Sequence, residues 1–188
     1  IKNLYGAGNL AIVEVVDGAN HLLIAGYTVP DVAKYAFLGP LVGAGARVLF
    51  SPLTDRMGGA IWTFIAGIGL LGSIAYTIQY VTPDISAGAV ALNSEFHHFL
   101  YGMVAIFFFA GVGNASTFKQ MPMIFEPRQA GGVIGWVSAI AAFGPFIFGV
   151  CLASIAPANF LTGLAAFVVL CIAITWFRYA KPGAAKKS

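Results

Sequence analysis

The sequence predicts an all-α membrane protein with six transmembrane helices, or five if its first segment does not span. Of the 188 residues, 59% are hydrophobic and only 9% are charged, and the mean hydropathy is +0.86. This composition is too apolar and too poor in charge for a soluble domain of this size. Several runs reach the roughly 20 apolar residues that a membrane-spanning α-helix needs, whereas barrel strands would alternate over about 10.

The first candidate span, residues 1–29, has the weakest hydrophobic character. Five polar residues interrupt it: Asn9, Glu14, Asp17, Asn20 and His21. Glu14, Asp17 and His21 follow an i, i+3, i+7 spacing and would share one face of a helix. That face could line a polar path or carry protons, or the segment could be an amphipathic, poorly inserted helix.

The second span, residues 33–53, carries Arg47 near its middle. A central arginine costs about 2.5 to 3.5 kcal/mol on insertion scales, so its charge needs a partner. Gly39 and Gly43 lie eight and four residues before Arg47, so they share its helical face and would leave room beside it. From the spacing alone, a small bound anion and an ion pair with a carboxylate on another helix are both open.

The third span, residues 60–81, follows a short charged turn, and the fourth covers residues 97–125. The fourth begins with His97 and His98, which point about 100° apart on a helix and therefore favour an interfacial position over a metal site. Its second half is polar, with Gly111, Gly113, Asn114, Ser116, Thr117, Lys119 and Gln120. Polar groups that face lipid carry a large free-energy cost, so this half of the helix must face protein or a water-filled cavity.

Small residues mark the start of the fifth span, residues 131–156. Gly131, Gly135 and Ala139 recur every four residues, a stripe that lets membrane helices approach closely. Pro145 is expected to kink this helix. The sixth span, residues 159–178, is uniformly apolar, and residues 179–188 form a basic tail.

Basic residues predict the topology. Seven fall on one side if residues 1–29 span: Lys2, Arg56, Arg128, Arg178, Lys181, Lys186 and Lys187. Only Lys34 falls on the other side, so the positive-inside rule places both termini in the cytoplasm. We expect the chain to be a multi-pass protein of the inner (plasma) membrane. If residues 1–29 do not span, the N-terminus moves outside and the later helices keep their orientation.

No group of residues in the sequence predicts an enzyme, a cofactor or a nucleic-acid partner. Cys151 and Cys171 lie in apolar runs without a second type of metal ligand nearby. We therefore expect them to be packing residues, with no metal site and no redox role.

Two stretches resemble the NarK-type nitrate/nitrite porter family of the major facilitator superfamily. YAFLGPLVGAGAR followed by LTDRMGG is similar to that family's eighth helix and the cytoplasmic loop after it. GVGNASTFKQMP is similar to the family's second nitrate-signature motif, in its tenth helix. The resemblance covers residues 27–178 and implies the C-terminal half-bundle, helices seven to twelve, of a twelve-helix major facilitator transporter.

The resemblance also implies a substrate site. Arg47 matches the arginine with which the C-terminal half grips the anion, and Gly113, Asn114 and Ser116 stand in the signature helix whose backbone and small polar groups line that site. Tyr5 falls where the seventh helix has a binding tyrosine. The match weakens around Tyr5, because an expected phenylalanine one turn later is an asparagine and the acidic residues that follow depart from the family's pattern.

Lys119 is a further candidate for the substrate site, one turn after Ser116. Its ammonium could hold the anion or make transport depend on protons. Equally, it could extend toward the cytoplasmic interface, since Pro122 and Arg128 place that end close by.

The implied function is transport of nitrate and nitrite by alternating access, as nitrate/nitrite antiport or proton-coupled nitrate import. Nitrate is planar, and a guanidinium group can donate two parallel hydrogen bonds to it, so one arginine from each half could sandwich the ion. The implied partners are the two anions, the lipid bilayer, and an N-terminal porter half or a second copy. Because the N-terminal half's own arginine and signature motif are absent from this sequence, the alternative is a non-transporting scaffold or accessory subunit derived from such a half.

Overall fold

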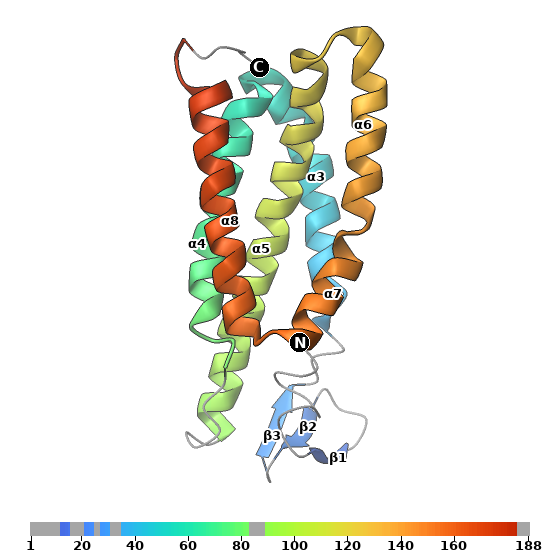
Figure 1. Cartoon of the computed structure of the whole chain (residues 1–188). Coiled ribbons are helices and arrows are strands. Elements are labelled where there is room, and N and C mark those ends of the chain that lie inside the picture. Colours follow the sequence, from blue (N-terminus) through green and yellow to red (C-terminus); the bar gives the residue numbers. More distant parts are fainter. Residues whose placement is uncertain (1–11, 16–20, 25–26, 31–34, 83–88, 184–188) are drawn as a thin grey trace.

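The computed structural model describes residues 12–15, 21–24, 27–30, 35–82 and 89–183, and this part of the chain forms a bundle of upright helices with a small sheet at one end (Figure 1). The helices are α3 (Leu38–Met57), α4 (Gly59–Ile78), α5 (Ala89–Ile124), α6 (Pro127–Ala142), α7 (Gly144–Ser154), α8 (Pro157–Thr175) and the π-helical turn η2 (Trp176–Ala180). The second to sixth expected spans overlap in order with α3, α4, α5, α6 together with α7, and α8.

Within the described residues, four helical stretches are long and apolar enough to cross a membrane. They are Gly59–Ile78, Ser94–Ile124, Pro127–Ser154 and Pro157–Ala180. Helix α3, with Arg47 at its centre, is not one of the four. The predicted helical membrane bundle is confirmed by these helices, and the small sheet is an addition to it.

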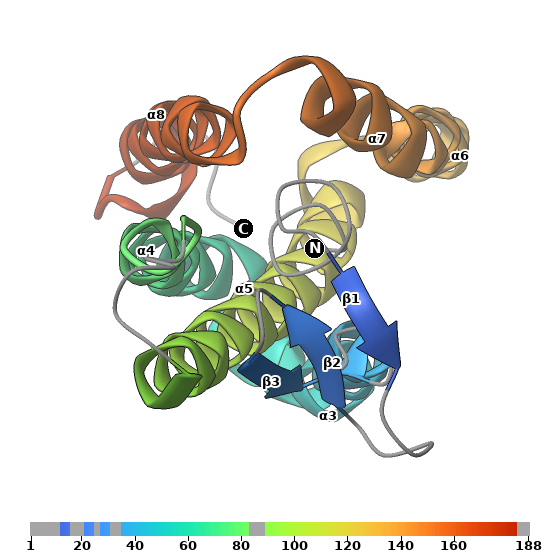
Figure 2. The same cartoon turned by 90° about the horizontal axis from the view of Figure 1, so that it is seen from below.

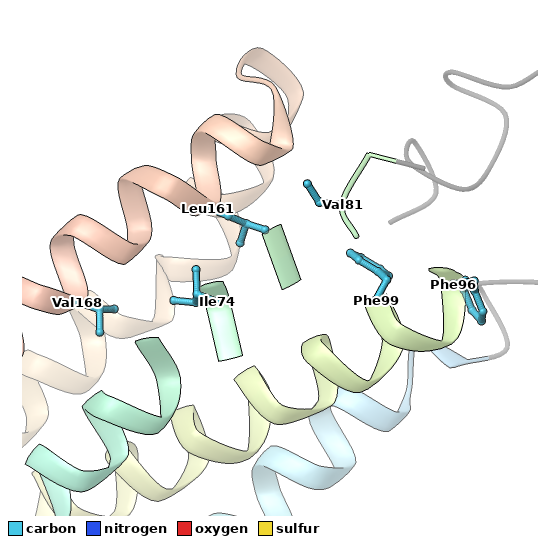
Figure 3. Packing of buried hydrophobic residues seen from close by; sticks show 6 residues of the cluster. All are labelled: Ile74, Val81, Phe96, Phe99, Leu161 and Val168. Atoms are coloured by element: carbon cyan, nitrogen blue, oxygen red, sulfur yellow. The ribbon is translucent and has the colours of Figure 1, made fainter. Parts of the chain in front are cut away.

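Helix α5 lies at the centre of the bundle, between α3 and α4, and α8 packs on α4 (Figure 2). One cluster of buried side chains joins α4, α5 and α8 (Figure 3), and its members are Ile74, Val81, Phe96, Phe99, Leu161 and Val168. A second cluster, formed by Ala46, Ala66 and Val112, joins α3, α4 and α5. Between membrane helices such packing stabilises through van der Waals contact, because lipid tails are as apolar as the side chains.

Helices α3 and α5 approach each other closely at glycines. A Cβ on Gly111 of α5 would collide with the carbonyl oxygen of Gly43 in α3, and a Cβ on Gly43 would lie 3.2 Å from the carbonyl oxygen of Phe107. The two backbones therefore meet without side chains between them, as small residues allow in membranes.

The span over residues 127–154 is broken rather than continuous. Phe143 separates α6 from α7, and its N–H donates to the carbonyl oxygen of Ile140 at 3.1 Å. Pro145 has no N–H to continue the helical ladder, so the expected kink occurs as a break just before it. In the small-residue stripe of α6, no described atom lies within 4 Å of a Cβ built on Gly131 or Gly135.

The described parts of residues 1–29 are strands, which differs from the expected first helix. Strands β1 (Ile12–Val15), β2 (His21–Ile24) and β3 (Tyr27–Pro30) pair antiparallel in that order. Val, Ile, Thr and Tyr favour strands, and the glycines between these runs disfavour a continuous helix. Glu14 pairs with Leu23 and His21 with Pro30, so the expected helical face of acidic and histidine residues does not form there.

The two ends of the bundle differ in chemistry. At the end where α4 finishes and α5 begins, the Tyr76 hydroxyl lies 2.6 Å from His98 Nδ1, and the ring of Tyr80 stacks on His98 with centroids 4.9 Å apart. At the other end, Arg128 lies at the start of α6 and Arg178 in η2 (Figure 1). Tyrosines typically mark membrane interfaces, so the expected interfacial position of the histidines agrees with this cluster.

Candidate functional site

Arg47 is the tenth of the 20 residues of α3. At 1.5 Å per residue, it lies about 14 Å from either end of the helix. Its side chain is exposed, and its guanidinium carbon lies 5.3 Å from the ring centroid of Phe118 in α5. Among the residues that the structure describes, no carboxylate forms an ion pair with Arg47. The ion-pair alternative therefore has no partner in that part of the chain.

The space beside Gly39 and Gly43 is taken by α5, which corrects the expectation that these glycines leave room for an anion. A Cβ on Gly39 would lie 2.5 Å from Cε2 of Phe107, and Gly43 faces the Phe107 backbone. The shared helical face was correctly identified from the spacing, but it meets another helix. Any anion at Arg47 must approach from the side of α3 that α5 leaves exposed.

Asn114 lies on the same face of α5 as Phe118, because the two residues are four apart in one helix. The Asn114 side chain is exposed. Since the Arg47 guanidinium lies over Phe118, the structure brings Arg47 and Asn114 to the same side of the α3–α5 pair. We call this side, defined by Arg47, Asn114 and Phe118, the open face.

Gly113 and Ser116 point elsewhere, toward α4. A Cβ on Gly113 would lie 3.6 Å from that of Ala66. Ser116 is fully buried, and its hydroxyl donates to the Gly113 carbonyl oxygen at 3.0 Å and accepts from the Thr63 hydroxyl at 2.9 Å. These two residues of the signature stretch therefore hold α5 against α4, and the structure does not bring them to the open face.

The other two predicted site residues are separate from this cluster. Lys119 is half-buried and follows Phe118 directly, so it points about 100° around α5 from the open face. Tyr5 lies outside the described residues.

A cavity of about 400 Å³ lies between α4, α5, α6 and α8. Asn114, Gly113, Thr117 and Phe118 form part of its wall, but most of the lining is apolar. Among the described residues that line it, none is a lysine or arginine. Asn114 and Phe118 belong both to the open face and to the wall of this cavity. Because no described residue of that wall is a lysine or arginine, the part of the open face at Arg47 suits an anion better than the cavity itself.

Sequence reasoning missed two residues of this region. Phe118 could have been found, because it follows Asn114 by four residues in a stretch already singled out as polar. Thr63 gave no signal, because its partner Ser116 is 53 residues away along the chain.

No protein-family profile matches the chain. Over 162 residues, however, it is 49% identical to the "Probable nitrate/nitrite antiporter NarK2" of Thermus thermophilus, an alignment that covers 84% of this chain and 35% of the relative. The chain belongs to the nitrate/nitrite porter family.

Two further members of the nitrate/nitrite porter family are more distant. The nitrate/nitrite transporters NarU of Escherichia coli K12 and of Salmonella typhimurium are 27% and 28% identical to the chain. Each alignment is 192 residues long and covers 87% of the chain. The chain spans about 35 to 40% of the length of these relatives. In this porter-family chain, the residues exposed on the open face are an arginine and an asparagine of the two stretches that carry the family resemblance.

Proposed function

We propose that this chain forms one half of a nitrate/nitrite porter in the plasma membrane and supplies one of the two walls between which the anion passes. The observation that carries the proposal is the exposed guanidinium of Arg47 at the middle of α3, which has no ion-paired carboxylate among the side chains that the structure describes. We infer that α3 spans the bilayer and holds this group at mid-depth. A permanent cation at that depth is costly unless something neutralises it. A transported anion would do so transiently.

The chemistry of the open face suits nitrate and nitrite. A guanidinium group is planar, always charged and carries five N–H donors, so it can donate two parallel hydrogen bonds to a small oxyanion. Asn114 adds an amide that donates without adding charge. One cation and neutral donors can bind a monovalent anion and still release it.

The open face needs a second wall. Arg47 and Asn114 would each cost several kcal/mol if they faced lipid. Alternating access between two half-bundles provides such a wall at the midplane of the membrane. We infer that an N-terminal porter half, or a second copy of the chain, covers the open face and that the uncovered stripe of Gly131 and Gly135 belongs to the same contact region.

The direction of transport and the orientation are part of the proposal. Nitrate/nitrite antiport and proton-coupled nitrate import are both compatible with a single arginine on this wall. The end of the bundle that carries Arg128 and Arg178 would face the cytoplasm, by the positive-inside rule.

The test is a complete porter in which residues 1–188 replace the segment of Thermus thermophilus NarK2 with which they align. Purified into vesicles, it should exchange external nitrate for internal nitrite, or take up nitrate when a proton gradient is applied. The matched control carries Arg47→Gln, which keeps a polar side chain, although a shorter one, and removes the charge. A porter that inserts normally and moves neither anion, with flux equal to that control, would refute the proposal and favour a non-transporting scaffold.

A further inference from the structure

We propose that Phe118 is a positioning residue for Arg47, holding the guanidinium in the plane in which it binds the anion. The inference rests on the proposed function, because it adds a residue to the same site. Its starting point is the contact itself: the guanidinium carbon lies over the Phe118 ring, 5.3 Å from the centroid, within the range of a cation–π interaction.

The contact restricts Arg47 without using its hydrogen-bond donors. Arginine has a long side chain with about 2 kcal/mol of rotamer entropy, and a bidentate site needs its fork held in one orientation. An aromatic ring attracts the cation through its π face, whereas the five N–H donors lie in the guanidinium plane. A carboxylate in the same position would occupy two of those donors and neutralise the charge. Phe118 therefore leaves both the charge and the donors available.

The surroundings of Phe118 support this role. Gly39 and Gly43 bring α3 close enough to α5 for the Arg47 side chain to reach the ring. Phe118 is half-buried and also lines the largely apolar cavity between α4, α5, α6 and α8, so its ring is held among apolar neighbours. Low local polarity strengthens a cation–π contact.

Two kinds of variant separate positioning from simple packing. Phe118→Leu removes the ring and keeps an apolar side chain, whereas Phe118→Tyr and Phe118→Trp keep a ring. Phe109→Leu is the matched control, because Phe109 lies on the same helix and lines the same cavity but makes no contact with Arg47 among the described residues. Insertion of each variant is checked by its yield in membranes.

The first readout does not depend on transport. The chain in vesicles is treated with an arginine-selective dicarbonyl reagent, and modification of the peptide that contains Arg47 is followed by mass spectrometry. The ring lies against the guanidinium, so Phe118→Leu should speed modification, and Phe118→Tyr and Phe109→Leu should not. Equal rates for all variants would show that the ring does not restrain Arg47 and would overturn the inference.

The second readout is the nitrate KM of the complete chimeric porter. Loss of a cation–π contact should raise KM about 2- to 30-fold for Phe118→Leu, with maximal flux changed less than twofold, and Phe118→Trp should restore the wild-type value. An equal rise in KM for Phe109→Leu, or an unchanged KM for Phe118→Leu, would overturn the inference. Absence of any flux in the unmutated chimera would instead count against the proposed function.

Discussion

The glycine contact between α3 and α5 allows a quantitative test of the fold. Gly111→Ala adds a Cβ that would collide with the carbonyl oxygen of Gly43, a backbone atom that cannot rotate away. Forcing such a group into a packed contact typically costs about 1 to 3 kcal/mol. The substitution also stabilises the helix by about 0.5 to 1 kcal/mol, because alanine favours a helix more than glycine does. The measured loss of stability is therefore smaller than the free-energy cost of the clash.

A matched control removes the helix-propensity gain. Gly163 lies inside α8, and no described atom lies within 4 Å of a Cβ built there. Gly163→Ala therefore gains the same propensity without a clash, and the difference between the two variants isolates the contact. At about 2 to 4 °C per kcal/mol for a chain of this size, Gly111→Ala should melt about 2 to 12 °C below Gly163→Ala.

The assay is thermal unfolding of the full chain in detergent, followed by circular dichroism and by the loss of monodisperse protein. Both variants should insert, since neither adds charge. Equal melting temperatures for Gly111→Ala and Gly163→Ala would show that α3 and α5 do not approach at this point, and the placement of Arg47 beside Phe118 would fail with it.

Three further results are expected. Arg47→Lys keeps the charge but loses the bidentate fork, so nitrate affinity of the complete porter should fall about 10- to 100-fold with normal insertion; near-normal affinity would remove Arg47 from the site. Thr63→Val removes the interhelical hydrogen bond to Ser116 and should lower stability by about 0.6 kcal/mol, with flux retained, and a complete loss of flux would place this pair in the substrate site after all. Lys119→Gln should change the nitrate KM of the complete porter much less than Arg47→Lys does. An equal change in KM would show that Lys119 belongs to the anion site.

Composition and apolar run length were sufficient to predict the helical bundle, because lipid imposes long apolar helices on any spanning chain. The sequence also singled out Arg47 and Asn114, because polar residues within apolar stretches are visible without a structure, and their role in a substrate site stays a prediction. It could not show that Ser116 faces α4 and that Gly39 faces Phe107, because a spacing defines a face but not what covers that face. The prediction of a helix was wrong at residues 12–15, 21–24 and 27–30 for a different reason: the local preference of these residues for strands outweighs a marginal hydrophobic length.

The backbone contact between α3 and α5 also constrains how a porter built on this chain could move. A slip of one helical turn would bring Phe107 or Ala115, each with a Cβ, to the place where only Gly111 fits against the Gly43 carbonyl oxygen. The two helices therefore cannot slide along each other, and the Arg47 guanidinium of α3 and the Asn114 amide of α5 must move together as one rigid unit. Access to the anion would then change when α3 and α5 tilt together against the second wall. The groups that this chain offers to the anion would stay the same throughout the transport cycle.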